Sequence, residues 1–308
     1  MNEIAEPLVV GAAPVPVSSP VGAAVLRDYI TLTKPRIMSL LVLTSVCAMV
    51  AAAGGSPRLA GLAALVVGGA LACGGASALN HVLDRDIDKL MGPRTASRPV
   101  AAGRIAPRDA VAFALTLSLL SFVILTVFAN VLTAALALSG GAFYVVVYTL
   151  WLKRTTPQNI VIGGAAGAIP PLAGWAAANG HLGLGALFLF LIVLLWTPPH
   201  FWALALLLAP QYSAARVPML PVVRGAQATA RQVLLYTVAL VAISLAPGVL
   251  GTFGGLYLVT AVALNGVLCW FAWRLWRRPQ AARAAVLFHY TLLYLALLFV
   301  AVALAAAL

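Results

Sequence analysis

Charged side chains are scarce in this sequence. They make up 8% of its 308 residues, whereas a soluble domain carries about a quarter. Hydrophobic residues account for 63% of the chain, and the mean hydropathy is +1.04. Water could not solvate a folded surface of this composition, so the sequence predicts a protein embedded in lipid.

Cysteine is also rare. Cys47, Cys73 and Cys269 lie singly within apolar stretches. Their spacing provides neither a disulfide framework nor a set of metal ligands. We interpret them as small residues packed between helices.

The net charge of +12 does not indicate nucleic-acid binding. The Lys and Arg residues lie in short segments between apolar runs, and no basic arm or domain is present. If each apolar run crosses the membrane once, all Lys and Arg residues except Arg58 lie on the same side of it. The positive-inside rule makes that side cytoplasmic and places the N-terminus inside.

Apolar runs of membrane-spanning length define the domain organisation. Residues 1–26 contain Glu3 and Glu6 and no basic segment of a signal peptide, so they are predicted to be a flexible cytoplasmic tail. Residues 27–308 are predicted to form a single, all-α transmembrane domain. Its nine expected spans are 37–53, 59–79, 109–128, 131–151, 160–177, 184–208, 233–251, 254–273 and 285–307.

The acidic residues are concentrated at one place. Only seven occur, none follows Asp109, and three fall between Asp84 and Asp88 at the end of the second run. Asn80, Asp84 and Asp88 are spaced i, i+4, i+8 and would share one face of a continuing helix. Oxygen ligands of this kind suit Mg²⁺, which typically uses one or two carboxylates together with water and phosphate oxygens.

A solvated charge cluster at a helix end is the alternative interpretation. It leaves the amide of Asn80 unexplained, because such a group is costly at the end of an apolar run unless it has partners. Asp86 would point to the other side of the helix, where it would pair with a neighbouring Arg.

Basic side chains follow this acidic cluster closely. Lys89, Arg94 and Arg98 lie within ten residues of it and could bind the oxygens of a diphosphate. Lys153 and Arg154 end the fourth run, where a phosphate-binding role and a simple topology signal are equally compatible with the sequence.

A second candidate lies in the sixth run. Pro198 and Pro199 interrupt it, and His200 follows at membrane depth between Trp196 and Trp202. An ionisable residue inside a membrane is a candidate functional group, although a hydrogen-bonded structural histidine is the alternative.

The element formed by Asn80, Asp84 and Asp88 resembles the first aspartate-rich motif of the UbiA-type intramembrane prenyltransferases. Within that family, four stretches are similar to the haem O synthases. They are Thr33–Arg36, Tyr148–Gly167, Trp196–Trp202 and Val217–Val223.

The resemblance implies a fold of nine helices around a central cavity in the cell membrane. It implies a Mg²⁺-dependent enzyme that transfers the farnesyl group of farnesyl diphosphate to a vinyl group of haem B, with addition of water, to give haem O. His200 would then bind haem, position the acceptor or help water capture the cation. The partners implied are haem A synthase and cytochrome oxidase assembly.

One departure from the family pattern concerns the second acidic motif. The loop Leu208–Tyr212 carries Gln211 at the position where haem O synthases usually have Asp. Gln211 would offer one neutral oxygen as a weak replacement ligand. Lys153, Arg154 and Arg216 would then carry more of the phosphate charge.

Three other functions are compatible with parts of the sequence. A UbiA-type transferase could act on a quinone or an aromatic acceptor, and a non-catalytic haem-binding assembly factor could have lost turnover with the second motif. A transporter fits less well, because its carboxylates would lie near the middle of the membrane rather than at one face.

Overall fold

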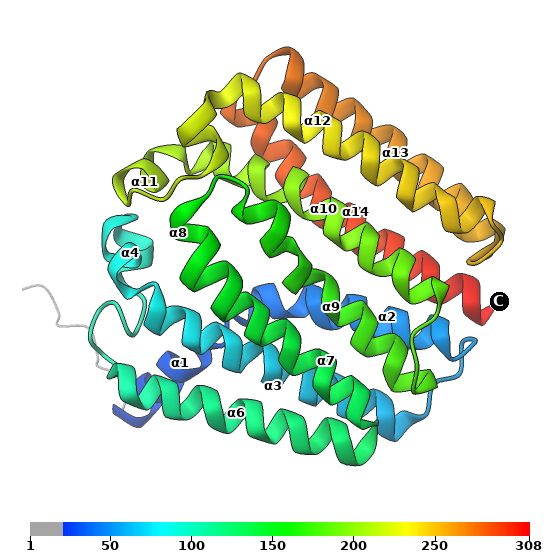
Figure 1. Ribbon diagram of the computed structural model, residues 1–308, viewed down its shortest axis with the longest axis horizontal. Helices are drawn as coiled ribbons and strands as arrows, with labels where there is room; N and C mark the ends of the chain where they lie inside the picture. Colours follow the sequence, from blue (N-terminus) through cyan, green and yellow to red (C-terminus); the bar gives the residue numbers. More distant parts are fainter. Residues whose placement is uncertain (1–20) are drawn as a thin grey trace, which may run out of the picture.

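The computed structural model describes residues 21–308, and all regular structure in this part of the chain is helical (Figure 1). The helices, in chain order, are α1 (Val21–Leu32), α2 (Pro35–Ala52), α3 (Leu59–Leu83), α4 (Arg85–Leu90), α5 (Pro93–Ala96), α6 (Pro107–Phe128), α7 (Val131–Ala142), the π-helix η1 (Phe143–Leu152), α8 (Lys153–Thr155), α9 (Asn159–Asn179), α10 (Leu184–Leu207), α11 (Ala209–Ala214), α12 (Leu220–Val249), α13 (Gly254–Arg277) and α14 (Ala281–Ala307).

Nine helical segments between residues 21 and 308 are long and apolar enough to cross a membrane. They are α2, α3, α6, the continuous segment Val131–Thr155, α9, α10, α12, α13 and α14. The predicted fold class and number of spans are therefore confirmed.

Two boundaries differ from those expected. The span predicted at 233–251 is too short, because α12 begins at Leu220. Its first turns carry Arg224 and Arg231, and hydropathy does not detect a polar helix end. The chain is already helical from Val21, so residues 21–26 belong to α1, whereas residues 1–20 of the predicted tail lie outside the described residues.

The break between α6 and α7 has a local cause. Asn130 is the N-cap of α7, and its side-chain oxygen accepts a hydrogen bond from the backbone N–H of Thr133 at 2.9 Å. Its amide nitrogen donates to the carbonyl of Ala176 in α9 at 2.7 Å. A single polar residue therefore ends one span, begins the next and attaches both to a third helix.

Small residues allow the helices to approach one another closely. Gly75 in α3 lies against the backbone of Ala114 in α6. Gly174 in α9 lies directly against the carbonyl oxygen of Ser45 in α2. These contacts join α3 to α6 and α2 to α9.

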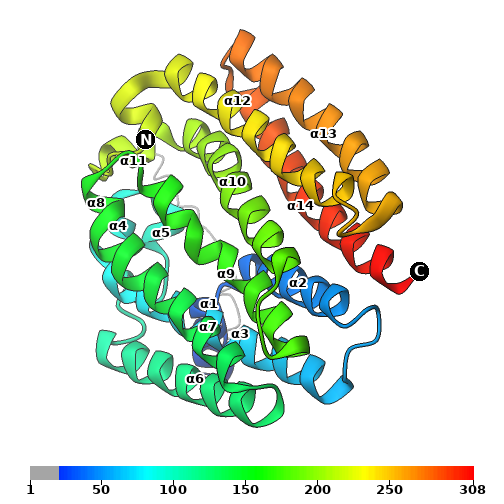
Figure 2. The same cartoon turned by 45° about the vertical axis from the view of Figure 1, so that its right-hand side comes forward.

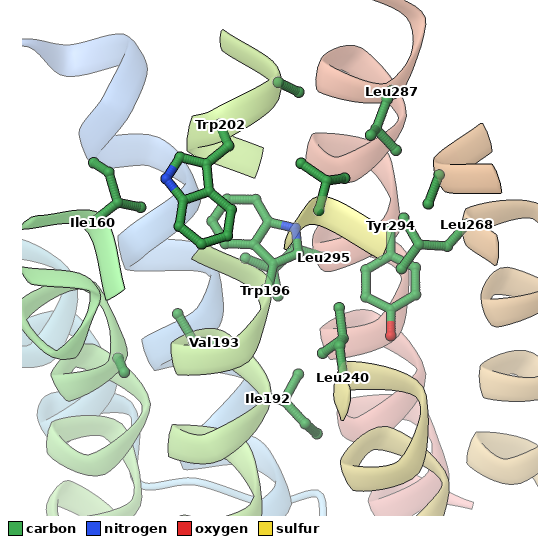
Figure 3. Close-up of a cluster of buried hydrophobic side chains, with 14 of the residues drawn as sticks. Ile160, Ile192, Val193, Trp196, Trp202, Leu240, Leu268, Leu287, Tyr294 and Leu295 are labelled. Atoms are coloured by element: carbon green, nitrogen blue, oxygen red, sulfur yellow. The ribbon is translucent and has the colours of Figure 1, made fainter. Parts of the chain in front are cut away.

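Several of the largest buried side chains come from α10 and α14. Figure 3 shows Trp196 of α10 next to Leu295 of α14, with Trp202 toward Ile160 and Tyr294 toward Leu268. Trp202 and Tyr294 are almost completely buried. This packing, like that of any close-fitted core, holds the two helices in one arrangement.

The short helices gather at one end of the bundle. Figures 1 and 2 show α4, α8 and α11 close together at the same end, and Figure 2 also places α5 there. This is the end at which α3 finishes with the acidic cluster.

Candidate active site

The acidic cluster keeps its helical spacing across the junction of α3 and α4. The backbone N–H of Asp84 donates to the carbonyl of Asn80 at 2.9 Å, and that of Asp88 donates to the carbonyl of Asp84 at 2.7 Å. Both aspartates are only 1% exposed. The i, i+4, i+8 arrangement expected from the sequence is therefore present.

One oxygen of each carboxylate is held by a basic residue. Lys153 Nζ donates to Asp84 Oδ2 at 2.5 Å, and Arg98 Nη1 donates to Asp88 Oδ1 at 2.6 Å. Asn80 Nδ2 also donates to Asp84 Oδ2, at 2.8 Å. The structure thus brings two of the predicted diphosphate-binding residues, Arg98 and Lys153, to the acidic pair.

The second oxygen of each carboxylate has no hydrogen-bond partner. Asp84 Oδ1 and Asp88 Oδ2 are both buried without a hydrogen bond, and Arg154 Nη2 lies 4.0 Å from Asp84 Oδ1. Burial raises the pKa of Asp88, although Arg98 acts in the opposite direction. Unpaired buried carboxylate oxygens are costly, and a divalent cation would satisfy them. No group of three His, Cys, Asp or Glu side chains forms a fuller ligand set within residues 21–308, so the rest of a metal's shell would come from other donors.

Lys34 is a site residue that sequence analysis missed. Its Nζ donates to Asn80 Oδ1 at 2.6 Å. Its backbone has a φ of 50°, an uncommon conformation for a residue with a side chain, just before Pro35 begins α2. Burial lowers the pKa of Lys34 to about 7, and the positive charges of Arg98 and Lys153 add to the effect. The only signal was its place in Thr33–Arg36, where it could not be distinguished from a topology lysine.

Thr149 is a second residue that was missed, and it lies in the π-helix η1. Its hydroxyl accepts a hydrogen bond from Asn80 Nδ2 at 3.1 Å and donates to the carbonyl of Tyr144 at 2.9 Å. Thr149 and Lys153 are four residues apart, as are the Asn80 and Asp84 they contact. π-Helical turns are rare and occur often at functional sites. Nothing in the apolar run indicated one.

Arg154 makes a different contact from the one expected. It forms two hydrogen bonds with the carboxylate of Asp86, at 2.7 and 2.8 Å, and a third with the carbonyl of Leu83 at 2.8 Å. These bonds lower the pKa of Asp86. Asp86 pairs with an arginine as predicted, although with one 68 residues away rather than a neighbour in the sequence. The guanidinium of Arg154 joins α8 to the junction of α3 and α4, and its predicted role at the diphosphate stays a prediction.

The other predicted polar residues do not contact the acidic pair. Lys89, Arg94 and Arg216 are exposed, with no ion pair to any described carboxylate. Arg216 has a φ of 54°. Gln211 is partly buried, and its Oε1 lacks a hydrogen-bond partner. The roles assigned to these four residues stay predictions.

His200 lies in the packing between α10 and α14. Its ring stacks on Trp196 and on Phe288, with centroid distances of 4.3 and 4.8 Å. Its Nδ1 lies 2.8 Å from the hydroxyl oxygen of Thr291, whose carbonyl accepts a hydrogen bond from Trp196 at 2.7 Å. None of these contacts joins His200 to the acidic pair, and its functional role stays a prediction.

The fold and the site define a class: a helical membrane protein with an aspartate-rich, lysine- and arginine-flanked site at one end. A model of the UbiA prenyltransferase family matches residues 41–298, and the chain belongs to this family.

Similar curated proteins carry a narrower name. A protoheme IX farnesyltransferase from Gloeobacter violaceus is 52% identical over 280 residues, which cover 91% of this chain and 92% of the relative. Proteins of the same name from Thermus thermophilus and Roseiflexus sp. are 51% and 49% identical over 92% and 91% of this chain. The chain spans about half the length of these two, 46% and 52%.

Solved structures share the fold. A digeranylgeranylglyceryl phosphate synthase has a TM-score of 0.76 at 19% identity, and the match covers 92% of this chain and 98% of that one. A UbiA homologue from Archaeoglobus fulgidus bound to GPP and Mg²⁺ has a TM-score of 0.61 at 14% identity, with 89% and 99% covered.

Proposed function

We propose that this chain transfers the farnesyl group of farnesyl diphosphate to a vinyl group of haem B and that water is added to give haem O. The observation that carries the proposal is the buried pair Asp84 and Asp88, each with one oxygen neutralised by a basic residue and the other without a hydrogen bond. Relatives that are about half identical and bear the name protoheme IX farnesyltransferase support this donor and acceptor over a quinone or an aromatic acid.

The proposed reaction breaks the bond between C1 of the farnesyl group and the diphosphate oxygen, and the electron pair of this bond leaves with the diphosphate. The π-electron pair of the vinyl group forms the new carbon–carbon bond. The oxygen of water then bonds to the other vinyl carbon and loses a proton to solvent.

The open oxygens fit a magnesium ion. Asp84 Oδ1 and Asp88 Oδ2 would hold it, in keeping with the one or two carboxylates that Mg²⁺ uses beside phosphate. When bound, Mg²⁺ would supply positive charge that stabilises the departing diphosphate. The Archaeoglobus homologue, which shares the fold, was solved with GPP and Mg²⁺, which supports a magnesium-dependent reaction.

The residues around the carboxylates have separate tasks in this proposal. Arg98 and Lys153 hold the two aspartates and add positive charge beside the diphosphate. Asn80, expected as a third magnesium ligand, has its oxygen engaged by Lys34 and fixes the orientation of Asp84 through its amide nitrogen. Its role as a metal ligand stays a prediction. Lys89, Arg94 and Arg216 would reach the phosphates from the surface. The partly buried Gln211 would offer its unpaired oxygen as a weak further ligand.

We further propose that the chain lies in the cell (inner) membrane with its N-terminus inside. All Lys and Arg residues except Arg58 belong to the end of the bundle that holds the acidic pair, which the positive-inside rule makes cytoplasmic. Haem O made there would pass to an enzyme that oxidises it further, so haem A synthase and cytochrome oxidase assembly are the expected partners.

The test is product formation. Membranes containing the protein would be incubated with haem B, farnesyl diphosphate and Mg²⁺, and haem O would be sought by chromatography and mass spectrometry. We expect product that disappears with EDTA and in Asp84→Asn. The matched control, Asp86→Asn, should retain activity because the exposed Asp86 contacts Arg154 and neither carboxylate of the pair. No product, with a known haem O synthase active in the same assay, would exclude this acceptor.

A further inference from the structure

A cavity of about 370 Å³ lies outside the acidic site, between the beginning of α12 and the end of α13. Figures 1 and 2 show these two helices side by side at the edge of the bundle. The cavity is lined by Leu220, Arg224, Gln227, Ala228, Arg231, Gln232 and Trp276. Its charged side chains are therefore two arginines, and the neutral polar ones are two glutamines, whose amides can donate hydrogen bonds.

The two arginines of this cavity have no acidic partner in the described chain. The ion pairs within residues 21–308 involve neither Arg224 nor Arg231, and no Asp or Glu follows Asp109 in the sequence. Two like charges that line one cavity repel each other, and an anion between them would relieve that repulsion. An arginine fork matches phosphate oxygens in particular.

The backbone of α12 shapes this cavity. Gly225 has a φ of 78° and interrupts the helix between the two arginines. On the other side, the side-chain amide of Gln227 donates to the carbonyl of Trp276 in α13 at 3.0 Å. The kink therefore shapes the α12 wall of the cavity, and the hydrogen bond joins this wall to α13 without a ligand.

The surroundings are those of a membrane surface. Val222 and Val223 next to Arg224 are exposed, and so are Trp270 and Trp273 on α13. Arg274 and Arg277 lie over the rings of these two tryptophans, at 5.9 and 5.7 Å. Trp and Arg at the end of a membrane helix are typical of the headgroup region of a bilayer.

We propose that this cavity binds a phosphate-bearing anion, the headgroup of an anionic phospholipid or a free phosphate. The phosphate would lie between Arg224 and Arg231, with Gln227 and Gln232 as further donors. The exposed apolar residues beside the cavity favour a lipid, whose chains would lie along them. Basic pockets between helices on the cytoplasmic side are suited to such headgroups.

The experiment measures bound lipid on the purified, delipidated full-length protein by native mass spectrometry. Phosphatidylglycerol is titrated in mixed micelles, with phosphatidylcholine and inorganic phosphate as separate arms. We expect selective retention of phosphatidylglycerol, reduced at least roughly tenfold in Arg224→Gln/Arg231→Gln. The matched control, Arg108→Gln/Arg278→Gln, removes the same charge from the same side outside the cavity and should bind normally.

The other outcomes are equally informative. Binding of inorganic phosphate without preference for phosphatidylglycerol, lost in the same double variant, would identify the free anion as the occupant. Equal losses in both double variants, or none in either, would overturn the proposal. If the double glutamine variant fails to fold, retention of phosphatidylglycerol is compared instead in each single glutamine variant and in Arg224→Lys/Arg231→Lys. The readout does not depend on haem O formation and so stands apart from the proposed activity.

Discussion

Lys153 and Asn80 donate hydrogen bonds to the same oxygen of Asp84, at 2.5 and 2.8 Å, although Lys153 lies 69 residues from Asp84 in the sequence. The lysine neutralises a carboxylate that is almost fully buried, and it leaves Oδ1 without a hydrogen bond. Without such a partner, a buried charge of this kind would be strongly destabilising.

This pairing predicts that Lys153→Met abolishes most of the proposed activity. Asp84 would lose its compensating charge, and the diphosphate would lose a neighbouring cation. We expect haem O formation to fall by about a hundredfold or more. The measurement is kcat/KM in purified membranes, with Lys153→Arg as the variant that should recover part of the rate.

Arg154→Met is the matched comparison for that variant. Arg154 is engaged by Asp86 and by the carbonyl of Leu83, so its loss should weaken the attachment of α8 and reduce the rate less than about tenfold. Equal losses in the two variants would instead show that Arg154 leaves Asp86 to bind phosphate, as the sequence first suggested.

Asp28 provides a prediction about pH. Its carboxylate accepts hydrogen bonds from Arg104 at 2.8 and 2.9 Å, which join α1 to the segment before α6 and hold the pKa of Asp28 below its ordinary value of 3.8. Because the pKa is lower in the folded state, the pair stabilises α1 above that ordinary value, and its contribution is lost as the pH falls through the lowered pKa.

For an exposed pair the effect is about 0.2–1 kcal/mol. Asp28→Asn should therefore increase amide hydrogen exchange of α1 at neutral pH, while Asp109→Asn should not. As the pH falls, the difference in amide hydrogen exchange of α1 between Asp28→Asn and the unmodified chain should become smaller. A difference that persisted unchanged at acid pH would contradict the assigned role of the carboxylate.

Local patterns were sufficient to predict the spans and the acidic motif. Apolar runs of the right length located nine helices, and the i, i+4, i+8 spacing placed Asn80, Asp84 and Asp88 together. The opposite direction of Asp86 followed from the same helical geometry. These features depend on neighbours within two or three turns, so they can be read from a single stretch of sequence.

The partners of those residues could not be predicted in the same way. Lys34 reaches Asn80 across 46 residues, and Thr149 does so across 69. Both contacts depend on how α2 and η1 pack against α3. The π-helical turn and the polar beginning of α12 were missed for a related reason, because hydropathy records composition and not hydrogen-bond register.

A buried polar network joins the last three helices and predicts a stability effect. Asn265 of α13 donates to the hydroxyl of Ser244 in α12 at 2.8 Å and accepts from Tyr294 in α14 at 2.9 Å. Asn265→Leu should remove both bonds and lower stability by about 1–2 kcal/mol. The midpoint of thermal unfolding in detergent would measure this loss, with Thr260→Val as control, because half-buried Thr260 bonds only within its own helix. An unchanged midpoint would mean that the three helices are held by apolar packing alone.

Two glycines of α9 should respond in opposite ways to the same substitution. A Cβ at Gly174 would overlap the carbonyl oxygen of Ser45, which is backbone and cannot rotate away, so α2 and α9 would have to separate. A Cβ at Gly167 would meet nothing within 4 Å. Gly174→Ala should therefore destabilise the protein by about 1–3 kcal/mol, whereas Gly167→Ala should be neutral or stabilising by up to about 1 kcal/mol through its helix propensity. Unfolding midpoints of the two variants, measured side by side, test the close approach directly, because equal midpoints would show that α2 and α9 are not in backbone contact.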